Sequence, residues 1–218
     1  PAAELASSDQ IIQDVPNLEL DHPWAISAEE ALELAIALET AGLEADARIT
    51  NSDGGSVSTS RSISVHGTSE GLMVSQTSSM HGMSCVLLAE DGDSRERSYA
   101  YSQARNPSQL LAAESVGLEA AEKTVARLNP RKCETGEVPV LFSADVAAGI
   151  LSSFFSAISG GALYRKSSYL LDRIDTQVMP SWANLVENPR LPGAIGSSAY
   201  DADGLPTREQ AFISDGIL

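Results

Sequence analysis

The sequence predicts an α+β fold, in which an antiparallel four-stranded sheet is flanked by two helices and followed by the start of a second, mainly β unit. Three observations favour this fold. Apolar residues recur at helical spacing on both sides of the stretch 51–105, their spacing changes to strand alternation inside it, and turn residues separate its short runs. Helices on either side of a run of strands are typical of α+β proteins.

Composition and turn residues divide the chain into three parts. Residues 1–26 are acidic, contain prolines and are expected to form an extended lead-in. Residues 27–130 form an α-β-β-β-β-α unit, and residues 131–218 begin a second, β-rich domain. The chain starts with Pro1 rather than Met and stops just after an Asp-Gly turn signal, so we expect both ends to be cut and the second domain to be truncated.

The first helix is predicted over residues 27–41. Ser27 and Glu30 have the spacing of a capping box, in which each side chain accepts a hydrogen bond from the other residue's backbone N–H. Gly42 is expected to end the helix. Apolar residues follow the cap at helical spacing: Ala31, Leu34, Ala35 and Leu38.

Four strands are predicted after this helix. Polar and apolar residues alternate over 57–65, which marks the first strand, and the second and third strands are expected over 72–76 and 84–89. The hairpin signal Glu-Asp-Gly-Asp at 90–93 precedes a fourth strand over 95–101. Sequential strands joined by short turns predict an antiparallel meander.

The second half of the sequence returns to helical spacing. A second helix is predicted over 108–128, followed by a short buried strand over 138–142. Ser143 is expected to cap a further helix that ends at the glycines 160–161. Residues 178–218 are rich in turn residues and predict irregular β structure.

The charge of the chain excludes several classes of partner. Acidic residues outnumber basic ones by 30 to 14, which gives a formal net charge of −16. Nucleic acids and anionic membranes attract clusters of Lys and Arg, so we expect neither as a partner. No apolar run approaches the roughly 18–20 residues of a transmembrane helix. Two cysteines cannot form a disulfide framework, and they indicate a reduced, cytoplasmic setting.

The residue patterns contain no catalytic motif. His22, His66 and His81 have no His or Cys partner at the spacing of a metal site, so each is expected at the surface or packed. Cys85 lies in an apolar strand and is expected to be buried and unreactive, whereas Cys133 follows two basic residues in a linker. The residues alone therefore predict no catalytic residue, no metal ligand and no cofactor.

Several segments, in order along nearly the whole chain, resemble the PmbA (TldE) branch of the TldD/PmbA metallopeptidase family. Whole members of that family are longer at both ends, which agrees with the truncation expected above. The resembling segments include Arg-Ile-Thr-Asn-Ser-Asp-Gly-Gly-Ser at 48–56, Arg-Ser-Tyr-Ala-Tyr at 97–101, Leu-Asn-Pro-Arg-Lys at 128–132, and the stretches 160–172, 200–207 and 213–218.

The resemblance implies a cytoplasmic bacterial peptidase system. TldD and PmbA pair as a heteromeric metalloprotease, associated with maturation of the microcin peptide antibiotic and degradation of an antitoxin. In TldD the corresponding helix carries H-E-x-x-x-H, whose imidazoles bind zinc and whose glutamate activates water. Here the matching positions hold Ser153, Phe154 and Ile158, and the family's third zinc ligand lies beyond Leu218.

The resemblance therefore predicts a metal-free partner subunit that works beside a TldD-like, metal-bearing subunit. Together they would mature peptides and degrade small unfolded proteins, with the peptide bound in extended form along a sheet edge. Two alternatives stay open. One is an autonomous metallopeptidase whose metal ligands lie outside this segment, and the other is a non-proteolytic, peptide-binding homodimer.

Overall fold

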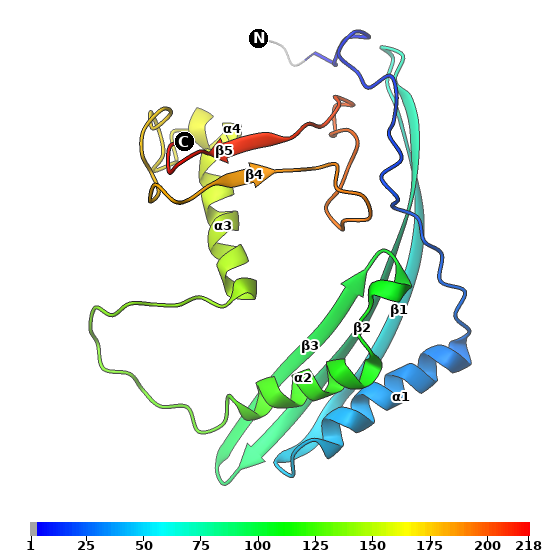
Figure 1. Cartoon of the computed structure of the whole chain (residues 1–218), viewed down its shortest axis with the longest axis vertical. Coiled ribbons are helices and arrows are strands. Elements are labelled where there is room, and N and C mark those ends of the chain that lie inside the picture. The colour runs from blue at the N-terminus through cyan, green and yellow to red at the C-terminus, as the bar shows by residue number, and fades with distance from the viewer. Residues whose placement is uncertain (1–3) are drawn as a thin grey trace. The chain divides into compact units, whose positions relative to one another are not determined.

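The computed structural model describes residues 4–218, so the first three residues of the predicted lead-in lie outside the described residues (Figure 1). The chain divides into two compact units. The first contains the residues up to Arg131 together with Pro189–Arg208, and the second contains Lys132–Asn188 together with Glu209–Leu218. The chain therefore leaves the first unit, builds most of the second, returns to the first over Pro189–Arg208, and then completes the second.

The sheet of the first unit has three antiparallel strands rather than the predicted four. Its strands are β1 (Ile49–Gly67), β2 (Met73–Asp91) and β3 (Ser94–Ala104), in the order β1-β2-β3. The prediction of separate strands over 72–76 and 84–89 is wrong, because both belong to β2. The intervening polar residues stay in the strand because β1 pairs with them throughout.

Two α-helices, α1 (Ala28–Glu44) and α2 (Ala113–Val125), cover one face of this sheet (Figure 1). The capping box predicted at the start of α1 is confirmed, since Ser27 and Glu30 exchange side-chain to backbone hydrogen bonds. The second predicted helix is shorter than expected: a 3₁₀ turn at Pro107–Gln109 precedes α2.

The main core lies between the helices and alternate residues of β2. Leu38 of α1, Leu87 of β2 and Val116 of α2 are each fully buried there. The helices approach closely at glycines, and a Cβ atom on Gly117 would overlap the backbone carbonyl oxygen of Leu38. Close helix contact at this position therefore requires glycine.

Beyond the end of β3, the lead-in and the returning segment Pro189–Arg208 pack against β2. Ser79 of β2 donates its backbone N–H to the carbonyl oxygen of Leu20, at 2.9 Å. A second apolar cluster forms here, and it consists of Ile11, Ile12, Leu18, Leu20, Leu72, Val74 and Ala199.

The second unit contains more helix than strand among its described residues, so the prediction of a mainly β unit is wrong. It consists of α3 (Ala144–Ile158), α4 (Gly160–Tyr164) and the paired strands β4 (Leu185–Glu187) and β5 (Gln210–Ile213). Residues 138–142 form no strand, because no ladder partner lies beside them in the described chain. No helix within residues 4–218 is both long enough and apolar enough to cross a membrane.

Candidate functional site

Helix α3 carries the three positions that the sequence singled out. Ser153 is exposed, and its hydroxyl donates to the carbonyl oxygen of Gly149 one turn earlier, at 3.2 Å. Phe154 is 6% exposed, and Ile158 is partly buried. The helix therefore brings Phe154 and Ile158 toward the interior and leaves Ser153 outside.

Phe154 is part of the small core of the second unit. Its side chain packs in a cluster with Leu170 and with Ile213 of β5, and Ile158 lies against the same cluster. Apolar residues four apart on a helix share one face, which explains why both turn toward β5. Neither side chain has an atom that can ligate a metal or move a proton, so their role at these positions is packing.

Two cavities lie beside Ile158. One of about 550 Å³ is lined by Ile158, Phe212 and other apolar residues, with Asp172 as its charged group. The other, of about 640 Å³, is shared by Ile158, Phe155 and Phe212, with Glu187 at its edge. Both volumes lie in the range of ligand sites. Of the three positions that align with the zinc motif, Ile158 therefore lines both cavities, and each cavity has one acidic side chain in its lining.

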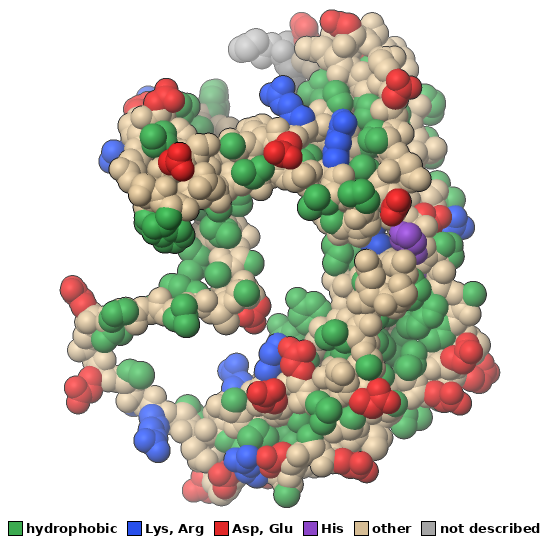
Figure 2. All heavy atoms as spheres, in the orientation of Figure 1, with side chains coloured by type: hydrophobic (Ala, Val, Ile, Leu, Met, Phe, Trp, Pro, Cys, Tyr) green, Lys and Arg blue, Asp and Glu red, His purple; other side chains and the backbone are tan. Residues whose placement is uncertain are grey.

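Large apolar side chains make up much of the remaining surface of α3. Figure 2 shows hydrophobic side chains along this helix, and four large ones are at least one third exposed: Val146, Ile150, Leu151 and Phe155. The exposed serines of α3 donate their hydroxyl hydrogens to carbonyl oxygens of the same helix, which leaves only their oxygen atoms free to accept hydrogen bonds from outside. Exposed apolar surface of this extent is typical of an interaction site.

The three histidines belong to the first unit. His81 is buried, and both of its ring nitrogens form hydrogen bonds of 2.8 Å. Nδ1 pairs with the Thr59 hydroxyl, and Nε2 pairs with the carbonyl oxygen of His22. A carbonyl oxygen only accepts, so Nε2 carries a proton. The prediction of a packed histidine is confirmed for His81. Within residues 4–218, no group of three or more His, Cys, Asp or Glu side chains could hold a metal ion.

Sequence reasoning missed a buried polar junction in the first unit. Arg105 is 8% exposed and donates to the carbonyl oxygens of Ser79, Ala194 and Ile195. The Ser79 hydroxyl in turn accepts from the His22 N–H at 2.8 Å. The available signal was the polar interruption of the apolar pattern in β2, since a buried polar residue must find partners.

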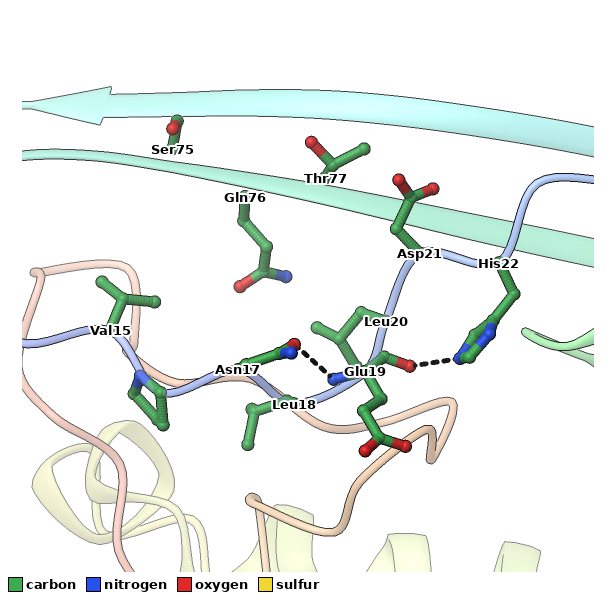
Figure 3. Close-up of a pocket in the computed structure, with 11 residues that line it drawn as sticks. Val15, Asn17, Leu18, Glu19, Leu20, Asp21, His22, Ser75, Gln76 and Thr77 are labelled. Carbon is green, nitrogen blue, oxygen red and sulfur yellow. Dashed lines mark hydrogen bonds between the residues drawn. The ribbon is translucent and has the colours of Figure 1, made fainter.

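The junction borders a cavity of about 530 Å³ between the lead-in and β2 (Figure 3). Residues 15–22 form one wall, and residues 75–77 of β2 form the other. At its edge, the Asp21 carboxylate accepts hydrogen bonds from the Arg61 guanidinium, which hold the pKa of Asp21 below its usual range. Asp21 is therefore an ionised, paired group.

Comparisons with known proteins agree with the resemblance noted in the sequence. A model of the PmbA/TldA metallopeptidase central domain matches residues 21–128, and a model of the C-terminal domain matches residues 135–218. The chain is 40% identical to Metalloprotease PmbA of Escherichia coli O157:H7 over 218 residues, which are 100% of this chain and 48% of that protein. It is 42% identical to the Metalloprotease PmbA homolog of Haemophilus influenzae over 98% of this chain and 48% of the relative.

The fold is also found in a solved structure. The crystal structure of TldE from Thermococcus kodakarensis superimposes with a TM-score of 0.77 and 20% identity, over 99% of this chain and 48% of that one. The chain thus spans about half the length of the curated relatives it matches. Two consecutive domain models and relatives at about 40% identity lead to one conclusion: the chain belongs to the PmbA/TldD metallopeptidase family.

Proposed function

We propose that this chain is part of a metal-free partner subunit in a TldD/PmbA-type peptidase that acts on peptides. The observation that carries the proposal is that Phe154 is buried in the apolar core of the second unit. Phe154 stands at the position that aligns with the glutamate of the zinc motif, and its phenyl ring packs against Leu170 and Ile213. A zinc peptidase needs imidazole or carboxylate ligands and a base beside the metal-bound water.

A subunit of this kind contributes binding rather than zinc chemistry. The exposed apolar surface of α3 and the two cavities beside Ile158 offer contacts for apolar side chains of a peptide or for the metal-bearing subunit. The free cysteines, Cys85 and Cys133, support a reducing cytoplasmic compartment for the complex. The relatives named as metalloproteases support the class of reaction.

The test is reconstitution of the full-length protein with the TldD-like subunit encoded in the same genome. Purified alone, the full-length protein is expected to contain far less than one zinc per chain by elemental analysis and to cleave no unfolded peptide. Mixed with the partner, it is expected to form a stable complex that contains zinc and cleaves peptide. The control replaces the glutamate of the partner's zinc motif by glutamine, which leaves the complex intact and abolishes cleavage.

Two results would contradict the proposal. About one zinc per chain, retained after mild chelation together with cleavage by the isolated protein, would favour the autonomous metallopeptidase. Failure to associate with any TldD-like subunit, combined with peptide binding by a homodimer, would favour the non-proteolytic alternative.

A further inference from the structure

The cavity between the lead-in and β2, which we name the lead-in cavity, borders an edge of the sheet that carries no strand within residues 4–218. β3 ends at Ala104, opposite His81 of β2, so β2 continues past it without a ladder partner on that side. Leu20 of the lead-in occupies the next position by accepting the backbone N–H of Ser79. The lead-in then diverges from β2, and the cavity opens where it does so.

Ser75 and Thr77 line this cavity and belong to the part of β2 that has no partner in β3. Along an antiparallel strand, alternate residues direct their N–H and C=O groups to the same edge. Because the Ser79 N–H points to the lead-in, the N–H and C=O groups of Thr77 and Ser75 point to the same edge. In the part of the chain that the structure describes, no hydrogen bond is formed by these four groups.

The far wall of the cavity is held in place by hydrogen bonds. Glu19 adopts a left-handed backbone conformation with φ of 52°. Its N–H donates to Asn17 Oδ1 at 3.0 Å, and its carbonyl oxygen accepts from His22 Nε2 at 2.8 Å. On the other side, Gly193 donates its N–H to the carbonyl oxygen of Leu18 at 2.7 Å. These contacts fix the lead-in at a distance from Ser75 and Thr77.

The chemistry of the walls suits polypeptide main chain. In Figure 3 the Gln76 carboxamide projects from β2 toward the lead-in, where Asn17 supplies a second amide. Amide side chains and free strand groups both donate and accept hydrogen bonds, as a peptide bond does. Glu19 adds a carboxylate to the cavity lining, and the chain carries a net charge of −16, so an acidic ligand is disfavoured.

We propose that the lead-in cavity binds a short extended peptide segment of neutral or basic character, which adds to the edge of β2 by pairing with Ser75 and Thr77. Strand addition of this kind takes its affinity from main-chain hydrogen bonds and its selectivity from the flanking side chains. The site adds to the proposed partner-subunit function but does not depend on it, because the cavity lies entirely within the first unit.

The test measures binding of the fluorescein-labelled peptide Lys-Val-Thr-Val-Lys to the full-length protein by fluorescence anisotropy. The wild type is expected to bind it, and a peptide N-methylated at the central residues is expected to bind at least tenfold more weakly, because methylation removes the paired N–H groups. The variant Thr77→Pro, which removes the N–H at the edge, is expected to bind the unmodified peptide at least tenfold more weakly.

A matched control is available directly across the sheet. Ile63 of β1 pairs with Thr77 and is 70% exposed, and its N–H faces the opposite, outer edge of the same hairpin. The variant Ile63→Pro is therefore expected to bind the peptide as the wild type does, and circular dichroism checks that both variants fold. The peptide with N-methyl groups keeps the test valid if Thr77→Pro fails to fold.

Three outcomes would overturn the inference: no binding by the wild type, equal binding of the N-methylated peptide, or equal loss in Ile63→Pro and Thr77→Pro. Because these measurements use the protein without its partner and without zinc, they can fail while the reconstituted peptidase works. Conversely, peptide binding at this edge would stand even if no TldD-like subunit were found.

Discussion

The two units of the chain use apolar residues in opposite ways. In the first unit, α1 and α2 close over β2, and residues such as Leu38, Leu87 and Val116 are completely buried. In the second unit, α3 is richer in apolar residues than α1 or α2, yet Phe154 is its one buried residue among those described. The difference teaches that an apolar helix is not evidence of a core. In α3 most of the apolar residues stay exposed within the described part of the chain.

The largest expected effect comes from adding a methyl group to a glycine in each unit. Gly117→Ala is expected to destabilise the first unit by about 3 kcal/mol, because the new Cβ overlaps the backbone of Leu38 in α1. Gly149→Ala in α3 is expected to be neutral or to stabilise by about 0.5–1 kcal/mol, since a Cβ there meets open space. Urea denaturation of the full-length protein measures both, and equal effects would contradict the comparison.

A second variant tests whether the returning segment Pro189–Arg208 belongs to the first unit. Arg105→Met removes the donors to the part-buried carbonyl oxygens of Ala194 and Ile195 and to the buried carbonyl oxygen of Ser79, at an expected cost of about 1–3 kcal/mol. Limited proteolysis should then cut the returning segment sooner than in the wild type. The control is Arg97→Met, whose ion pair with Asp53 is exposed and contributes about 0.5 kcal/mol. Unchanged cutting in Arg105→Met would show that the junction does not hold this segment.

The two N-cap serines give a smaller and more local contrast. Ser27 and Glu30 form a complete capping box, so Ser27→Ala is expected to cost about 1 kcal/mol. Ser143 occupies the N-cap of α3 but makes no side-chain cap hydrogen bond, so Ser143→Ala is expected to change the free energy of unfolding by less than about 0.3 kcal/mol. Thermal unfolding followed by circular dichroism checks both variants. A larger loss of stability in Ser143→Ala than in Ser27→Ala would contradict the contrast between the two caps.

The smallest effect on stability, and the simplest to measure, concerns the two thiols. Burial raises the pKa of the Cys85 thiol to about 11, with a smaller contribution from Glu39. At pH 8, an iodoacetamide probe is expected to label Cys133, which is exposed, and to leave Cys85 unlabelled until denaturant is added. Rapid labelling of both thiols in the native protein would contradict the burial of Cys85.

The same shift predicts a pH dependence with a definite sign. The pKa of Cys85 is higher in the folded state than in the unfolded state, so the unfolded chain loses its proton first as the pH rises. The stability that the neutral thiol contributes is therefore complete below the unfolded pKa and is lost as the pH rises through the folded value of about 11. The variant Cys85→Ala should show a smaller loss of stability over this range than the wild type.

Some features follow from short stretches of sequence alone. The capping box of α1, the turn at Gly92 between β2 and β3, and the burial of Cys85 were all predicted from neighbouring residues. The family resemblance was also local, since it came from contiguous motifs that the domain models then matched. Such features depend on caps, turn conformations and side-chain alternation, which act over a few residues.

Other features were decided by the tertiary structure. The continuity of β2 through its polar stretch depends on β1, on the lead-in and on Arg105, which anchors residues about ninety positions later in the chain. The lead-in cavity exists for two reasons. The last residue of β3 pairs with His81, so the first residues of β2 have no partner in β3, and Glu19 turns the lead-in away from that edge. No local pattern encodes these contacts. A buried polar residue such as Ser79 shows that partners must exist, but which segments supply them is decided when the whole chain packs.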